Sequence, residues 1–94
     1  MSNPRTVVIT GGGSGIGASV ARAFVASGDR VFLSDLSEER AQATVADISS
    51  NLVTAHHVDV TDVSSVEALF AAVRREAGAV DVLAFGINRE GDAP

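Results

Sequence analysis

Eight residues near the start of the chain, Thr10 to Gly17, constrain its fold more than any other stretch. They read Thr-Gly-Gly-Gly-Ser-Gly-Ile-Gly and hold five of the nine glycines in the 94-residue sequence. An apolar, β-branched segment precedes them, and a segment with helical spacing of apolar residues follows. A glycine loop between a buried strand and a helix places backbone N–H groups where an anion can bind. The stretch therefore predicts a phosphate-binding turn in an α/β protein.

The rest of the chain alternates strand and helix. Strands are expected over residues 5–10, 30–35, 52–60 and 80–85, with helices over 16–27, 37–48 and 64–77 and a polar, irregular tail over 86–94. The order β-α-β-α-β-α-β implies a parallel sheet with right-handed crossovers, in which the first strand is central. We expect a three-layer Rossmann-type α/β fold in one small domain.

Capping residues and apolar stripes define the expected helices. Gly28 and Gly78 stand where C-terminal caps belong, Ser37 precedes two acidic residues, and Ser64 with Glu67 matches a capping box. The apolar residues expected to face the sheet are Ile16, Val20, Ala23, Phe24 and Ala26 in the first helix, Ala41, Val45 and Ile48 in the second, and Val66, Leu69, Phe70 and Val73 in the third.

Composition narrows the class of protein. The formal net charge is -5 without a basic cluster, which argues against nucleic-acid binding. Cysteine is absent, which excludes disulfides and thiolate metal sites and fits a reducing compartment. No apolar run approaches the ~18 to 20 residues of a membrane span, and no leader opens the sequence. A cytoplasmic protein without membrane contact is expected.

Three nucleotide-binding interpretations of the loop compete. A P-loop requires Lys-Ser/Thr after its last glycine, where this chain has Ala18-Ser19. A methyltransferase loop usually follows an acidic residue, and here Thr10 precedes it. The dinucleotide fingerprint fits in two spacings, G-x-G-x-x-A from Gly13 and G-x3-G-x-G from Gly11. A structural turn without a ligand is the remaining alternative.

Asp35 favours the dinucleotide interpretation. It ends the second expected strand, 18 residues beyond Gly17, where a carboxylate would accept hydrogen bonds from the adenosine ribose. The same charge would repel a 2′-phosphate, which favours NAD over NADP by ~1 to 3 kcal/mol. The alternative is an aspartate that caps a helix or faces solvent. The loop and the acid together predict NAD as the cofactor.

The segments Thr10 to Gly17, Asp35-Leu36 and Asp59-Val60 resemble the short-chain dehydrogenase/reductase family in its TGxxxGxG form. The resemblance covers residues 7–87 and implies a role for each matching position. The residues that would line the pyrophosphate and adjoining ribose are Gly11, Ser14, Gly15, Ile16 and Gly17. Asp35 and Leu36 would hold the adenosine, and Asp59 and Val60 would flank the adenine. Gly86 would match the motif glycine after the fourth strand. The alternatives are a turn aspartate for Asp59 and a core residue for Val60.

The sequence departs from the family in two respects. Members usually read Asp-Val-Leu-Val-Asn-Asn-Ala-Gly-Ile at the fourth strand, whereas residues 81–88 are about two residues shorter and lack the asparagine before the glycine. The family's chemistry also uses a Ser-Tyr-Lys set, and this sequence has no tyrosine and, because all seven basic residues are arginine, no lysine. No catalytic residue is therefore assigned, and the chain resembles the amino-terminal half of such an enzyme. The resemblance thus implies an incomplete three-layer Rossmann-type fold, with one partial NAD(P)-binding domain over residues 1–94.

Three functional hypotheses follow. The first is the NAD-binding portion of a dehydrogenase whose complete protein transfers hydride between NAD(H) and an alcohol or carbonyl. The second is a non-catalytic half-domain that binds a nucleotide or a partner, and the third is an inert truncated product. The fourth strand would expose an apolar edge, which predicts self-association. His56 and His57 point to opposite faces of a strand, so no metal site is expected.

Overall fold

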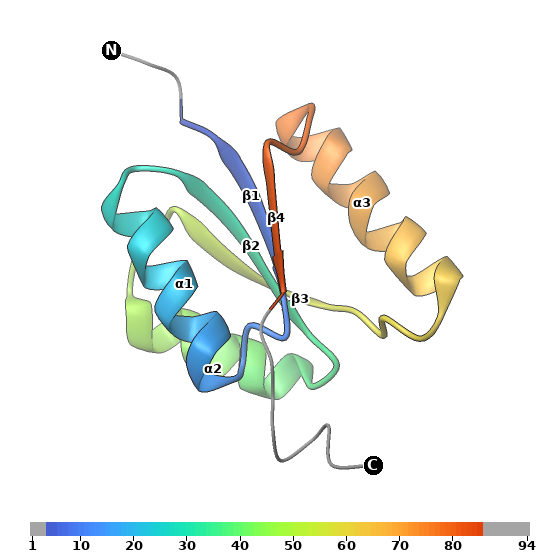
Figure 1. Ribbon diagram of the computed structural model, residues 1–94, viewed down its shortest axis with the longest axis horizontal. Helices are drawn as coiled ribbons and strands as arrows, with labels where there is room; N and C mark the ends of the chain where they lie inside the picture. The colour runs from blue at the N-terminus through green and yellow to red at the C-terminus, as the bar shows by residue number, and fades with distance from the viewer. Residues whose placement is uncertain (1–3, 86–94) are drawn as a thin grey trace.

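The protein is a sheet of four parallel strands with helices on both faces (Figure 1). The computed structural model describes residues 4–85. α1 and α2 lie on one face of the sheet and α3 on the other. The strand order is β3-β2-β1-β4, so the first strand is an inner one, and the predicted incomplete three-layer fold is confirmed. The elements are β1 (Thr6–Thr10), α1 (Gly15–Ala26), β2 (Arg30–Asp35), α2 (Glu38–Ile48), β3 (Val53–His57), α3 (Val63–Ala77) and β4 (Val82–Phe85).

Two apolar clusters, one on each face of the sheet, form the core. β1 and β2 supply both clusters because successive side chains of a strand point to opposite faces. Every residue of β1 is buried, as expected for an inner strand covered on both faces. The buried residues of the cluster on the α1 and α2 side are Val7, Ile9, Ala21, Val31, Leu33, Ala41 and Val53, and those of the cluster on the α3 side are Val8, Phe32, Val58, Leu69 and Val73.

The apolar stripes predicted for α2 and α3 pack against the sheet, but the stripe predicted for α1 is partly wrong. The residues of α1 that are buried are Gly17, Ala18 and Ala21. Ile16 is 52% exposed, and Ala23 and Ala26 are exposed as well. Val20 and Phe24 are partly buried and pack against the core, as predicted. None of the helices in residues 4–85 is long and apolar enough to cross a bilayer.

The helix ends follow the predicted caps except at α3. Gly28 (φ 87°) and Gly78 (φ 92°) have the positive φ that favours glycine. The capping box predicted from Ser64 is wrong, because the N-cap of α3 is Asp62. Its carboxylate accepts hydrogen bonds from both the N–H and the hydroxyl of Ser64 (3.0 and 2.7 Å). Ser64 therefore lies within the first turn.

β3 is shorter than the predicted strand over residues 52–60. It pairs with β2 only as far as Asp35↔His57, where β2 ends. The N–H of Val58 still donates to the carbonyl of Asp35 (3.0 Å), and the Val58 side chain then enters the core facing α3. Residues 58–60 consequently lie beyond the sheet. The fourth strand is also shorter, starting at Val82 instead of residue 80.

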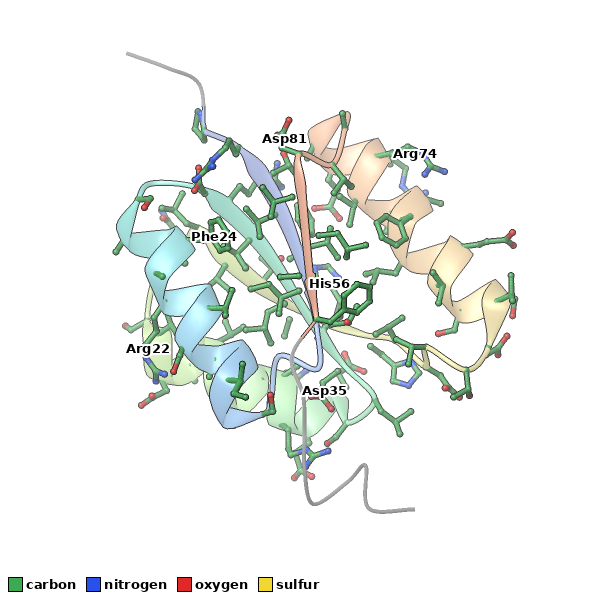
Figure 2. The ribbon with its side chains drawn as sticks, in the orientation of Figure 1. Arg22, Phe24, Asp35, His56, Arg74 and Asp81 are labelled. Atoms are coloured by element: carbon green, nitrogen blue, oxygen red, sulfur yellow. The ribbon has the colours of Figure 1, made fainter. Side chains whose placement is uncertain are left out.

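At the end of the sheet opposite the glycine loop, two aspartates connect neighbouring segments of the chain by hydrogen bonds. Asp29 accepts hydrogen bonds from Arg5 Nε and Nη2 (3.2 and 2.8 Å). Asp81 Oδ2 accepts the N–H of Thr6 (2.7 Å) and so connects the first and last described strands. Figure 2 shows Asp81 and Asp35 near opposite ends of the sheet. These bonds hold the strand register from the end remote from the loop.

β4 lies at one edge of the described sheet. It pairs with β1 on one side, and no strand among residues 4–85 pairs with its other side. Leu83 is 43% exposed and Phe85 is 66% exposed. The apolar edge that the sequence predicts is therefore present in this part of the chain.

Candidate functional site

The glycine loop makes a tight turn between β1 and α1. The chain turns at Gly11, whose φ of 68° suits glycine. The Ser14 hydroxyl donates to the carbonyl of Gly11 (2.8 Å), and the same oxygen accepts the N–H of Gly17 (3.1 Å). Ser14 is thus the N-cap of α1 and closes the turn. The N–H of Gly12 donates to the carbonyl of Ser34 (2.8 Å), which joins the loop to β2.

Three glycines of this loop, Gly12, Gly13 and Gly17, lack room for a Cβ atom, whereas Gly15 faces open space. A Cβ atom on Gly17 would overlap the carbonyl oxygen of Gly11 and lie 2.9 Å from the Cα of Gly12. A Cβ atom on Gly12 would overlap the side chain of Leu33. A Cβ atom on Gly15 would meet nothing within 4 Å. The loop is therefore packed tightly against β2 and against the start of α1, and it is open at Gly15, the first residue of α1.

The open side of the loop presents unpaired hydrogen-bond donors. No acceptor within residues 4–85 receives the N–H of Gly15 or of Ile16, and both residues are exposed. These groups belong to the first turn of a helix, where the helix dipole favours negative charge by roughly 0.3 to 2 kcal/mol. Two free donors beside a glycine without obstruction fit the oxygens of a pyrophosphate.

Asp35 is in contact with the loop. This residue is 4% exposed, and its Oδ2 accepts the N–H of Gly13 (2.8 Å). Its Oδ1 accepts the N–H of Ser37, the N-cap of α2 (2.9 Å). One carboxylate thus joins the loop, the end of β2 and the start of α2. The structure therefore brings together the glycine loop and Asp35, which the sequence analysis paired. Asp35 also binds the N-cap residue of α2, as in the alternative of an aspartate that caps a helix.

Arg40 belongs to the same site, although the sequence analysis assigned it no role. Its Nη2 lies 3.6 Å from Asp35 Oδ1, and its side chain is about half exposed. A Cβ atom on Gly13 would lie 2.8 Å from the Cβ of Arg40, so the base of the arginine side chain packs on the loop. The signal in the sequence that could have indicated this contact is spacing: Arg40 lies five positions after Asp35, in the first turn of α2.

The remaining predicted residues follow the ends of β2 and β3, at the same end of the sheet as the loop. Leu36 is 64% exposed and Val60 is 60% exposed, so the alternative of Val60 as a core residue is wrong. Asp59 Oδ1 accepts hydrogen bonds from the N–H and hydroxyl of Thr61 (3.0 and 2.6 Å). These bonds lower the pKa of Asp59 and form the turn that the alternative described. Gly86 lies outside the described residues.

The two histidines lie on the edge strand β3, where His57 is paired with Asp35 of β2. The ring centroid of His56 is 5.3 Å from that of Phe32, and its Nε2 is 2.8 Å from Thr54 Oγ1. Burial lowers the pKa of His56, whereas His57 is exposed. Within residues 4–85 no group of three or more metal-ligating side chains is found.

Comparison with known proteins identifies the family. The family model described as short chain dehydrogenase matches residues 5–92, nearly the whole chain. The chain belongs to the short-chain dehydrogenases. Among its relatives, a meso-2,3-butanediol dehydrogenase of Serratia marcescens is 38% identical over 79 residues, which is 84% of this chain and 32% of that protein. A galactitol 2-dehydrogenase of Agrobacterium fabrum is 37% identical over 81 residues, 86% of this chain and 31% of that protein.

Solved structures of short-chain dehydrogenases share the fold. A 3-ketoacyl-(acyl-carrier-protein) reductase from Brucella melitensis, complexed with NADH, matches with a TM-score of 0.78 and 29% identity, covering 84% of this chain and 32% of that one. A glucose/ribitol dehydrogenase-type protein from the same organism matches with a TM-score of 0.79 and 32% identity, covering 84% and 34%. The chain spans about a third of the length of the curated relatives it matches.

Proposed function

We propose that this short-chain dehydrogenase chain is the NAD-binding portion of an oxidoreductase. The observation that carries the proposal is the open loop at Gly15, with its two free N–H groups, next to the buried carboxylate of Asp35. The reductase of similar fold was solved with NADH. In the complete protein, hydride would pass between NAD(H) and an alcohol or carbonyl substrate.

Each residue of the site receives one role in this proposal. The pyrophosphate accepts hydrogen bonds from the N–H groups of Gly15 and Ile16, while Ser14, Gly11 and Gly17 keep the turn in shape. The Asp35 carboxylate accepts hydrogen bonds from the ribose hydroxyls. The adenine is bordered by the exposed side chains of Leu36 and Val60, beside the Asp59 turn. NAD, when bound, supplies the hydride-accepting nicotinamide.

NAD is preferred over NADP in this proposal because Asp35 is buried and held in place. Two backbone N–H groups fix its carboxylate, so the charge does not move away from an approaching 2′-phosphate. The repulsion is worth ~1 to 3 kcal/mol of discrimination.

A second candidate function is a non-catalytic half-domain that binds a nucleotide or a partner. The observation that favours it is composition, since a sequence without tyrosine or lysine does not supply the acid/base pair that the family uses. By this observation the 94-residue chain alone carries out no hydride transfer. The reading frame after residue 94 separates the two candidates, because an in-frame Tyr-x3-Lys supports the oxidoreductase and its absence favours the half-domain. A cytoplasmic location stays a prediction from the sequence.

Calorimetric titration of the chain with NAD and with NADP tests the proposal. Binding of NAD at the higher affinity is expected. Equal or tighter binding of NADP would contradict the role of Asp35. The absence of heat with either cofactor, for a chain shown to be folded by circular dichroism, would contradict the cofactor site itself.

A further inference from the structure

A cation stands beside the carboxylate that is proposed to select NAD. Arg40 is the only basic residue of α2, and its guanidinium lies 3.6 Å from Asp35 Oδ1. The two residues differ in exposure, because the aspartate side chain is 6% exposed and the arginine side chain is 52% exposed. A buried carboxylate and a half-exposed guanidinium thus lie where the 2′ position of the adenosine ribose would be in the proposed complex.

The two partners also differ in how firmly they are held. Both carboxylate oxygens of Asp35 accept backbone N–H groups, from Gly13 and Ser37. The Arg40 guanidinium has only its ion pair with Asp35 among the described residues, and 3.6 Å exceeds a normal hydrogen-bond length. An ion pair whose cation is half exposed, and whose atoms lie beyond hydrogen-bond distance, holds that cation weakly. The carboxylate is therefore fixed, whereas the guanidinium is available to a second anion.

We propose that Arg40 determines how strictly this site discriminates against a 2′-phosphate; the inference rests on the proposed function. With NAD, Asp35 accepts the ribose hydroxyls and Arg40 stays paired with the carboxylate. With NADP, the guanidinium turns from the carboxylate to the phosphate, whose oxygens match its planar set of donors. The pair makes the site prefer NAD while still admitting NADP, which Asp35 alone would exclude more strongly.

The test compares NAD and NADP affinities of four forms of the chain by calorimetry. The variants are Arg40→Gln, which removes the charge; Arg40→Lys, which keeps it; and Arg22→Gln as a matched control. Arg22 is 48% exposed and pairs with Asp47, so it is also a half-exposed arginine in an ion pair. Figure 2 shows Arg22 on α1, away from Asp35.

Arg40→Gln is expected to weaken NADP binding about five- to tenfold and to change NAD binding less than about twofold. Arg40→Lys should retain most of the NADP affinity, and Arg22→Gln should change neither cofactor. Raising the salt concentration should lower NADP affinity in the wild type and have a smaller effect in Arg40→Gln.

An unchanged ratio of NADP to NAD affinity in Arg40→Gln overturns the inference and leaves the cofactor site standing. Equal weakening of both cofactors also overturns it, because that result assigns Arg40 to loop structure. A folded wild-type chain that binds neither cofactor overturns the proposed function and the inference together.

Discussion

Replacing Gly15 with alanine should abolish most cofactor binding without harming the fold. A Cβ atom at this position meets nothing within 4 Å, and its φ lies outside the left-handed region. Alanine is therefore tolerated by the protein itself. Relative to glycine it also restricts the unfolded chain, which stabilises the fold by about 0.4 to 1 kcal/mol. The free energy of unfolding should rise slightly or stay unchanged.

The added methyl group occupies the space through which a pyrophosphate would reach the N–H groups of Gly15 and Ile16. Losing one such bond to a charged group costs about 1.5 to 3 kcal/mol. Each 1.4 kcal/mol corresponds to about a tenfold change in affinity. NAD binding should therefore weaken by about ten- to a hundredfold.

Gly17→Ala is the contrasting variant, two residues further along the same helix. Its Cβ atom would overlap the carbonyl oxygen of Gly11, and backbone atoms on both sides leave little room for relaxation. Overpacking of this kind costs about 1 to 3 kcal/mol or more. This variant should lose stability, and binding only as a consequence.

Urea unfolding followed by circular dichroism, together with calorimetric titration of NAD, measures both quantities. Circular dichroism suits this chain because its sequence has no tryptophan or tyrosine for fluorescence. Wild-type NAD affinity in Gly15→Ala would refute the placement of the pyrophosphate. Wild-type stability in Gly17→Ala would refute the close packing of helix and loop.

Two further predictions concern stability and assembly. The Arg5 guanidinium lowers the pKa of Asp29 below its ordinary value of 3.8, so this stabilisation is complete above that pH and is lost as pH falls towards the folded-state pKa. Asp29→Asn should therefore lower the urea midpoint at pH 7. It should also make the midpoint decrease less as the pH is lowered below 3.8, and the same dependence of the midpoint on pH in both proteins would contradict this. We also expect self-association through β4 that Leu83→Lys reduces in sedimentation velocity, while the control Val63→Lys, at a 72% exposed position on α3, does not; a monomeric wild type at high concentration would count against it.

Local patterns predicted the elements of the fold but not where each strand stops. Val58 and Val60 are β-branched residues that suit a strand, yet β3 ends at His57 because its partner β2 ends at Asp35. A strand's length is set by the neighbour with which it pairs, and that information lies elsewhere in the chain. The same limit applies to the start of α3, where Asp62 and Ser64 both carry capping oxygens and the tertiary structure selects Asp62.

The site was predicted as far as the motif extends. The glycine loop and Asp35 were paired from spacing alone, and the structure brings them into hydrogen-bond contact. Arg40 was missed because a charged residue that follows two acidic residues in the first turn of a helix carries no sign of a tertiary contact. Its contact with Asp35 depends on how α2 leaves β2, through the turn that begins at the N–H of Ser37. Spacing within a helix does not encode that direction.

The strand order has a consequence for synthesis on the ribosome. β1 emerges first, but one of its two neighbours is β4, and the bond from Thr6 to Asp81 spans 75 positions. The β-α-β units that pair β1 with β2 and β2 with β3 can form earlier, while the remaining edge of β1 stays without its partner until residue 85 has been made. Such late pairing slows folding and leaves an apolar strand open to wrong partners. The nascent chain should therefore be most vulnerable to aggregation after β3 has formed and before β4 is added.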